Sequence, residues 1–500
     1  MSIAVEVGLL SGQATTVRAS SEENVETLRF RAEAALGVRR GRLVDSCGSM
    51  LDEHVLIKDS SLQNGDSLTL LHISSVRACG ASNAFAAILG DGSVVTWGVG
   101  ATGGDSSSVQ NHLKNVQQIQ ANKFACAAIL GDGSVVTWGA ADFGGDSRAV
   151  RDQLQNVMQI QASGMAFAAI LVDGSVVTWG SASSGGDSTA VQDQLRTVQE
   201  IQATASAFAA IRDDGSVVTW GAANAGGDSS AVQDRLKNVQ QIQASDHAFS
   251  ALLAERTVVT WGGLGASDSG VQDQLQNVQQ IQATIGAFAA IRDNGSVVSW
   301  GAARSGGDSS VVQDQLKNVQ QIQATLRAFA AILGDGSVVT WGDAIYGGNS
   351  KAVQDQLKNV QQIQAADRAF AALLGNGSVV TWGEAGYGGN STAVQDQLKA
   401  VQQIQASELA FAAIRDDGSV VTWGAANCGG DSRAVRDQLT NVQHIQASNG
   451  AFAAILGDGS VVTWGDAVRG GNSSAVQHQL KNQQAVREML LLDVCKGAWA

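Results

Sequence analysis

Proline is absent from this 500-residue chain, although an average usage of ~5 % would give about 25 prolines. Proline-rich ligand motifs, polyproline linkers and cis-proline turns are therefore excluded. Tyrosine is also scarce, with two residues, whereas tryptophan occurs eleven times and glycine 58 times. Because 44 % of the residues are hydrophobic and 16 % are charged, the chain is not generically disordered. The length allows roughly two to five folded domains.

Cysteine and long hydrophobic runs are scarce as well. The five cysteines are scattered and form no C-x-x-C pair, which excludes a disulfide framework or a zinc knuckle and favours a reducing compartment. No apolar run approaches the ~18 residues that a membrane span needs. Glu6 interrupts the first apolar stretch without a basic segment before it, so we expect no signal peptide. We expect a cytoplasmic or nuclear protein.

Positive charge is in the minority, with 32 basic against 46 acidic residues and a net charge of −14. Direct nucleic-acid binding is not expected, because a phosphate backbone requires a basic surface. The six histidines recur at no fixed position, and the chain has no G-x-S-x-G, Walker or H-E-x-x-H motif. We therefore expect no catalytic centre, metal or cofactor.

Ten of the eleven tryptophans recur every 41 residues, with one interval of 39 residues between Trp261 and Trp300. Each lies in nearly the same frame: F-A-A-I-L-x-D-G-S-V-V-T-W-G, four variable residues, G-G-D-S and A-V-Q-D-Q-L-K-N-V-Q-Q-I-Q-A-S. This period is typical of propellers, solenoids and other arrays. The array covers about residues 75–484. The repeats are numbered here by their tryptophans: Trp97, Trp138, Trp179, Trp220, Trp261, Trp300, Trp341, Trp382, Trp423 and Trp464.

The D-G dipeptide between two apolar runs of each repeat predicts a β-hairpin with a two-residue type I′ turn. In the first repeat this register pairs Leu89 with Val94 and Ala86 with Trp97. Both faces of such a hairpin are apolar, so neighbouring repeats must cover them.

Three further features of the repeats bear on their structure. Val116, Ile119 and Ala121 indicate a third strand in each repeat. The fifth repeat alone lacks the turn signal, because it carries Glu255-Arg256 at that place. The G-G-D-S segment offers at most one acid per repeat, so a glycine turn is favoured over a calcium loop.

The frame F-A-A-I-L-x-D-G-S-V-V-T-W-G resembles the core of the regulator-of-chromosome-condensation repeat, in which an apolar strand, a D-G turn and a strand ending in W-G recur. Ala78-Cys79-Gly80 before Phe85 adds to the resemblance, which covers about four fifths of the chain. It implies an all-β propeller, usually of seven blades. These repeats are shorter than the family's, lack its proline segment and number ten. Since propellers usually have four to eight blades, a closed ring and an open superhelix both remain possible.

Two short segments vary between repeats: the four residues after each W-G and the two or three before each A-F. The hairpin register places both at the end opposite the D-G turn, as one continuous rim. Aromatic and arginine side chains are enriched in binding hot spots, and the family resemblance implies protein partners on such faces. The alternative is that exposed loops drifted after duplication. The candidate rim residues are Phe143, Arg304, Tyr346, Tyr387, Arg469, Arg327 and Arg368.

Residues 1–74 predict a separate α+β domain. The predicted order is a strand at 3–9, a strand at 15–19, a helix ending before Gly37, a segment at 42–44 and a strand at 67–72. Ser20 followed by Glu23 is a capping-box signature for the helix. This order resembles ubiquitin, as do Leu10-Ser11-Gly12, Arg42-Leu43-Val44 and the stretch from Leu51 to Leu71.

The ubiquitin resemblance implies an apolar receptor-binding patch at Leu10, Val44 and Leu71, unless these residues belong to the core. No di-glycine follows Leu71, so we expect a built-in module and no conjugation. The C-terminal tail, residues 485–500, is compatible with a short helix or with a closing strand on the first repeat.

These expectations favour a non-enzymatic scaffold or adaptor. The array would bind a protein partner, and the ubiquitin-like module would dock to ubiquitin-pathway or proteasomal machinery. One alternative, from the family resemblance, is guanine-nucleotide exchange on a small GTPase. Another is a relative or fragment of HECT-type ubiquitin ligases that lacks the catalytic domain, since only sixteen residues follow Gln484.

Overall fold

The chain divides into two compact units, Met1–Val76 and Arg77–Ala500, and each is described by itself. None of the helices in the described segments is long and apolar enough to cross a membrane. The computed structural model describes residues 2–8, 14–21, 23–36, 41–44, 51, 55–60, 62–72, 83–266, 270–482 and 486–491.

The N-terminal unit is a four-stranded sheet with one helix, α1 (Val25–Leu36). The strand order is β2-β1-β4-β3, in which β1 is antiparallel to β2 and parallel to β4. Valine and leucine side chains from the sheet and helix form its core. The predicted strands and helix lie where they were expected. The strands are β1 (Ser2–Gly8), β2 (Ala14–Ser20), β3 (Gly41–Val44) and β4 (Ser67–His72).

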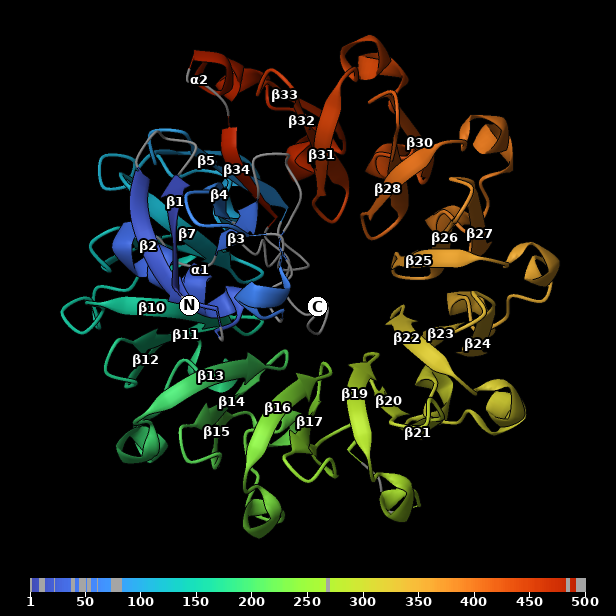
Figure 1. Cartoon of the computed structure of the whole chain (residues 1–500), viewed down its shortest axis with the longest axis horizontal. Coiled ribbons are helices and arrows are strands. Elements are labelled where there is room, and N and C mark those ends of the chain that lie inside the picture. The colour runs from blue at the N-terminus through green and yellow to red at the C-terminus, as the bar shows by residue number, and fades with distance from the viewer. Residues whose placement is uncertain are drawn as a thin grey trace. The chain divides into compact units, whose positions relative to one another are not determined.

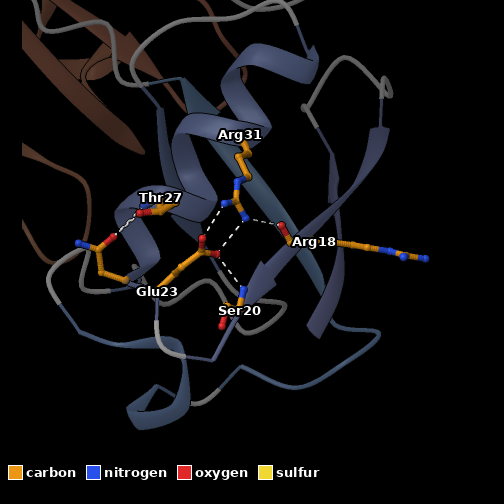
Figure 2. Close-up of polar contacts among 6 residues, drawn as sticks. Arg18, Ser20, Glu23, Thr27 and Arg31 are labelled. Carbon is orange, nitrogen blue, oxygen red and sulfur yellow. Dashed lines mark hydrogen bonds and ion pairs between the residues drawn. The ribbon is translucent and has the colours of Figure 1, made fainter. Parts of the chain in front are cut away.

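The start of α1 is held by a small polar cluster (Figure 2). Asn24 caps the helix, because its Oδ1 accepts the Thr27 N–H at 3.0 Å. Glu23 Oε2 accepts the Ser20 N–H at 2.8 Å and the Arg31 Nη1 at 2.9 Å. The bond to Arg31, followed by the bond to Ser20, lowers the pKa of Glu23. The predicted pair, Ser20 and Glu23, therefore makes one of the two hydrogen bonds of a capping box. The residue that caps α1 is Asn24, which follows Glu23 and directly precedes the helix.

In the part of the second unit that the structure describes, ten three-stranded antiparallel sheets follow one another (Figure 1). The V-x-x-I-x-A strands of nine sheets are β7 (Val116–Ala121), β10 (Val157–Ala162), β13 (Val198–Ala203), β16 (Val239–Ala244), β19 (Val278–Ala283), β22 (Val319–Ala324), β25 (Val360–Ala365), β28 (Val401–Ala406) and β31 (Val442–Ala447). The A-F-A-A-I-L strands occupy the middle of the sheets: β5 (Ala84–Leu89), β8 (Ala125–Leu130), β11 (Ala166–Leu171), β14 (Ala207–Arg212), β17 (Ala248–Leu253), β20 (Ala287–Arg292), β23 (Ala328–Leu333), β26 (Ala369–Leu374), β29 (Ala410–Arg415) and β32 (Ala451–Leu456). The strands ending in W-G are β6 (Val94–Gly98), β9 (Val135–Gly139), β12 (Val176–Gly180), β15 (Val217–Gly221), β18 (Val258–Gly262), β21 (Val297–Gly301), β24 (Val338–Gly342), β27 (Val379–Gly383), β30 (Val420–Gly424) and β33 (Val461–Gly465).

The predicted hairpin register is wrong by one residue. Ile88 pairs with Val94 and Phe85 with Trp97, so the loop contains three residues rather than two. Gly92 adopts a left-handed φ of +78°, as expected for a type I turn closed by a glycine bulge.

The aspartate of the D-G turn explains the longer loop. Asp91 Oδ1 accepts the N–H of Ser93 at 2.9 Å and its hydroxyl at 2.6 Å. A type I′ turn would need left-handed backbone at both Asp91 and Gly92, but Asp91 is not left-handed here. The bonds from Ser93 to the Asp91 side chain stabilise the longer loop instead. Leu89 N donates to Ser93 O at 2.8 Å and closes the loop.

The corrected register places the phenylalanine and the tryptophan of a repeat on the same face. Their rings stack at 5.2 to 5.5 Å in the nine repeats that carry both residues. The second repeat carries Cys126 opposite Trp138 instead. Hydrophobic clusters fill the space between successive sheets, with one face of each sheet against the opposite face of the next. As predicted, neighbouring repeats cover both apolar faces.

Each tryptophan also joins its repeat to the preceding one. In the second repeat the Trp138 Nε1 donates to Gly103 O at 2.9 Å, across 35 residues of sequence. The same bond joins the first repeat to the last, because Trp97 Nε1 donates to Gly470 O at 3.0 Å. The last repeat ends with α2 (Gln477–Asn482), and β34 (Val486–Leu491) follows in the tail. Strand β34 pairs with β5 and completes the first sheet, so the closing-strand alternative for the tail is the one that the structure shows.

Candidate interaction rim

The two variable segments of each repeat meet at the end of the hairpin opposite the D-G turn. In the seventh repeat the Asp343 N–H donates to Arg327 O at 3.0 Å, and in the eighth the Glu384 N–H donates to Arg368 O at 2.9 Å. The residues after W-G form short 3-10 turns in most repeats. The adjacency that the sequence predicted is therefore present, although alanine rather than phenylalanine lies opposite the glycine of W-G.

The turn that carries Tyr346 is held by framework groups. It spans Ala344–Tyr346, begins where Asp343 Oδ1 accepts the Ile345 N–H at 2.9 Å, and ends at Gly347 with a left-handed φ of +92°. The Thr325 hydroxyl donates to Tyr346 O at 2.8 Å. These bonds hold the backbone of the turn, so they fix the point from which the Tyr346 side chain extends.

Arginine and tyrosine side chains of the seventh and eighth repeats alternate in a ladder. The Arg327 guanidinium lies 5.3 Å from the Tyr346 ring centre. Arg368 lies between two rings, 5.0 Å from Tyr346 and 4.6 Å from Tyr387. These distances are in the range of cation–π attraction. We call Arg327, Tyr346, Arg368 and Tyr387 the Arg–Tyr ladder.

Arg368, at the centre of the ladder, forms a partly exposed ion pair with Glu384. Arg368 Nη1 lies 3.0 Å from Glu384 Oε2, and about a third of each side chain is exposed. The hydrogen bond to Glu384 raises the pKa of Arg368, so its charge persists at every physiological pH. The ladder presents a fixed cation between two aromatic faces.

The other three predicted rim residues lie outside the ladder. Phe143, in the second repeat, packs on Phe124 with ring centres 4.7 Å apart. Arg304, in the sixth repeat, is exposed, and Arg469, in the tenth, lies 3.6 Å from Asp466. The structure thus brings four of the seven predicted residues together.

Sequence reasoning missed three exposed apolar side chains among the described residues of the same rim, and one of them is Leu264 of the fifth repeat, which is 54 % exposed. Ile345 is 59 % exposed and directly precedes Tyr346, and Val468 is 65 % exposed at the equivalent place in the tenth repeat. The sequence could have revealed these side chains, because a large aliphatic residue is unusual in a segment otherwise rich in small and polar residues. Glu384 was also missed as the ion-pair partner of Arg368.

The predicted patch in the N-terminal unit stays a prediction. Leu10 lies outside the described residues. Val44 ends β3 and Leu71 lies in β4, where they pair with Thr69 and Arg42 respectively. The description covers the backbone of these two residues and not their side chains.

The G-G-D-S segment is a glycine turn, as expected. Gly103 has a left-handed φ of +105°, and the Ser106 hydroxyl lies 3.0 Å from Thr96 Oγ1 and donates to Gln110 Oε1 at 2.9 Å. Within the described segments, no three histidine, cysteine or acidic side chains are grouped so that they could hold a metal ion. The Cys126 thiol is buried, which raises its pKa and makes it unsuited to nucleophilic chemistry.

No family model and no curated protein matches the chain. Among solved structures, Prp20p from Saccharomyces cerevisiae is 16 % identical over 70 % of this chain and 82 % of its own, with a TM-score of 0.33. Yeast RCC1 (Prp20) bound to Kap60 is 14 % identical over 76 % of this chain and 90 % of its own, with a TM-score of 0.34. A designed protein based on ubiquitin is 20 % identical over 15 % of this chain and 94 % of its own, with a TM-score of 0.13.

Structures of the regulator-of-chromosome-condensation type are therefore similar to part of this chain. The description of the array as repeated three-stranded sheets rests on the chain's own strands and pairings.

Proposed function

We propose that the repeat array is a non-enzymatic scaffold that binds a protein partner through the rim of its sixth to eighth repeats. The observation that carries this proposal is the Arg–Tyr ladder, which spans two successive repeats. The framework of the repeats scarcely varies, and the ladder residues fall in the segments that do.

The chemistry of this rim favours a protein partner. Arginine and tyrosine are the residue types over-represented in binding hot spots. The exposed Ile345 beside the ladder adds an apolar surface that a partner could cover, and Arg327 and Arg304 supply further guanidinium groups. We further propose that the array is closed as a ring, supported by the bond from Trp97 to Gly470 and by the pairing of β34 with β5.

Affinity capture with the full chain as bait tests the partner proposal. We expect replacement of Arg327, Tyr346 and Tyr387 by alanine to lower partner recovery at least about tenfold. The matched control is Asn224→Ala with Asn427→Ala, in the equivalent turns of the fourth and ninth repeats. Unchanged recovery with the folded triple variant would contradict the proposal. Accelerated nucleotide release from a small GTPase would replace the scaffold role by exchange activity.

We propose that the N-terminal unit docks to ubiquitin-pathway machinery. Its sheet order and single helix support the proposal, since they agree with the ubiquitin resemblance. Deletion of residues 1–74 is expected to remove a ubiquitin-pathway component from the captured material while the rim partner stays. Recovery of the same components without residues 1–74 would refute the docking role.

A further inference from the structure

Four asparagines among the described residues directly precede a glycine, namely Asn64, Asn294, Asn376 and Asn449. In such a pair, the backbone nitrogen of the glycine can attack the side-chain amide of the asparagine, because no Cβ of the second residue hinders the approach. The product is aspartate or isoaspartate in place of asparagine, which is a covalent change of charge or of both charge and backbone. The hydrogen bonds of the four glycine nitrogens decide where this reaction can proceed.

Three of the pairs lie in tight turns in which both reacting groups are hydrogen-bonded. Their glycine N–H groups donate to backbone carbonyl oxygens: Gly65 to Ala4 at 2.7 Å, Gly295 to Arg292 at 2.8 Å and Gly377 to Leu374 at 2.9 Å. Their asparagine Oδ1 atoms also accept hydrogen bonds: Asn64 from the Ala4 N–H at 2.8 Å, Asn294 from the Ser296 hydroxyl at 2.7 Å and Asn376 from the Ser378 hydroxyl at 2.7 Å. A bonded nitrogen must break its hydrogen bond before it can attack, so these turns protect their asparagines.

The fourth pair, Asn449–Gly450, is bonded differently. It lies directly before β32, where Asn449 O accepts the Glu408 N–H at 3.3 Å and Gly450 O accepts the Asp466 N–H at 2.9 Å. Within the described part of the chain, the Gly450 N–H donates to no hydrogen bond. Exposure ranks the four pairs in the opposite order, because the three turn asparagines are exposed and Asn449 is half-buried. The effect of hydrogen bonding is therefore separable from that of exposure.

We propose that Asn449 is the site at which the folded chain deamidates. Gly450 N gives up its proton to solvent and attacks Asn449 Cγ, the bond from Cγ to Nδ2 breaks, and Nδ2 leaves as ammonia after taking a proton from solvent. Water then opens the five-membered imide. Opening between Gly450 N and Cγ gives aspartate, and opening between Gly450 N and the main-chain carbonyl carbon gives isoaspartate. Either product adds one negative charge, and water is the only co-reactant.

The two products differ in their effect on the fold. Asp246 and Asp367 stand at the equivalent position of the fifth and eighth repeats, so aspartate is compatible with the fold. Isoaspartate carries the main chain through Cγ and lengthens it by one atom, next to the bond between Glu408 N and Asn449 O that joins the ninth repeat to the tenth. We expect isoaspartate to weaken this junction. The site lies in the tenth repeat, outside the ladder, so it is independent of the partner proposal.

Incubation of the folded full chain at mildly alkaline pH, followed by peptide mapping with mass spectrometry, tests the site. Cleavage after lysine and arginine places the four pairs in four different peptides, and exchange of the amide NH2 for OH raises the mass of a peptide. We expect Asn449 to react at least about tenfold faster than each turn asparagine, a factor that corresponds to the free energy of one hydrogen bond. In the chain unfolded by guanidinium chloride, the four asparagines should react at similar rates.

Gly450→Ala is the matched variant. It should fold, because Met165 and Leu409 stand at the equivalent position of other repeats and Gly450 has no left-handed φ. The nearest atom to the new Cβ is Arg469 Cδ at 2.9 Å, which belongs to a flexible side chain. The variant should slow the reaction of Asn449 severalfold, because the Cβ crowds the attacking nitrogen, and leave the three turn rates unchanged.

Asn449→Asp supplies the chromatographic standard that distinguishes the aspartate peptide from the isoaspartate peptide. A turn asparagine that reacts as fast as Asn449 in the folded chain would overturn the proposal. So would an unreactive Asn449 under conditions in which the unfolded chain reacts, or an unchanged rate at Asn449 in folded Gly450→Ala.

Discussion

The fourth and fifth repeats have the same three strands but differ in the loop that follows the tryptophan. In the fourth repeat, the Thr219 hydroxyl lies 2.9 Å from the Ser229 hydroxyl, and Gly226 O accepts the indole N–H of the next tryptophan at 3.0 Å. In the shorter fifth repeat, the indole N–H of Trp300 donates to the Thr260 hydroxyl at 3.2 Å. The indole position is therefore set by the packing of the sheets, and different groups can satisfy its N–H.

A second substitution accompanies the change. Ser250 replaces an alanine in the middle strand of the fifth repeat, and the Thr260 hydroxyl donates to its oxygen at 3.5 Å. The Thr260 hydroxyl thus donates to Ser250 Oγ and accepts the indole N–H of Trp300. The comparison shows that the array tolerates a deletion when the buried polar groups find new partners.

The largest expected effect tests whether the two repeats have equivalent cores. Phe208 and Phe249 are both fully buried and stack on their tryptophans at 5.2 and 5.3 Å. Phe208→Ala and Phe249→Ala should each lower the free energy of unfolding by about 3–5 kcal/mol. Urea denaturation followed by tryptophan fluorescence measures both. A much smaller loss at Phe249 would show that the fifth repeat is loosely packed.

The next contrast concerns the two threonines. Thr260→Val should lower the free energy of unfolding by about 1–3 kcal/mol, because it leaves the buried Trp300 N–H without its acceptor. Thr219→Val should cost less, about 0.5–1.5 kcal/mol, since Ser229 keeps its bond to Gln233. The same urea transitions measure both variants. Equal losses would mean that the bond from Trp300 to Thr260 contributes no more than the bond between Thr219 and Ser229.

A smaller contrast lies in the turn. Gly215 has a φ of +73°, and a Cβ there would lie 2.8 Å from Asn238 Cα, so Gly215→Ala should lower the free energy of unfolding by about 1–2 kcal/mol. Arg256 occupies the equivalent place with a φ of +61°. Arg256→Gly should raise the free energy of unfolding by about 0.5 kcal/mol, because relief of left-handed strain exceeds the loss of an exposed ion pair with Asp293. Destabilisation by Arg256→Gly would show that the ion pair outweighs the strain.

The smallest contrast is in pH dependence. The hydroxyl and the N–H of Ser216 bond to Asp214 and lower the pKa of this carboxyl. A carboxyl with a lowered folded-state pKa stabilises the fold above its unfolded value near ~3.9, and this contribution is lost as pH falls through the folded value. Asp214→Asn should therefore flatten the stability profile slightly below about pH 4. The urea midpoint at pH 6, 4 and 3 measures the slope, and Glu255→Asp should steepen it if the fifth turn regains the bond.

Much of the framework follows from local sequence. The period, the three strands of each repeat, the covering of both hairpin faces by neighbouring repeats and the adjacency of the two variable segments all appear as predicted. The register does not, because D-G is compatible with two-residue and three-residue loops, and the bond between Asp91 and Ser93 selects the longer one. The asparagine that directly precedes the V-x-x-I-x-A strand was also missed: in seven repeats it adopts a left-handed φ between 51° and 57°, which asparagine tolerates better than other non-glycine residues.

The Arg–Tyr ladder could be predicted only in part. The sequence placed Tyr346, after W-G, and Arg368, before A-F, on the same predicted rim, but they belong to different repeats. Their contact at 5.0 Å depends on how the seventh and eighth sheets pack. The hydrogen bond from Arg235 to Gln272 could not be predicted either, since it joins two repeats and depends on how their sheets pack.

By itself, the sequence determined the number of repeats and the alternation of strand and turn, because glycine, β-branched residues and the D-G pair act over a few neighbouring residues. Only the tertiary structure decided which residues face each other and what the tail does. Strand β34 joins the first sheet although nearly 400 residues separate it from β5, and Trp97 finds its acceptor in Gly470, 373 residues away. Such pairings depend on the packing of every intervening sheet, which no local pattern of residues records. The absence of proline fits this outcome, since each backbone N–H of the repeated strands stays available for pairing.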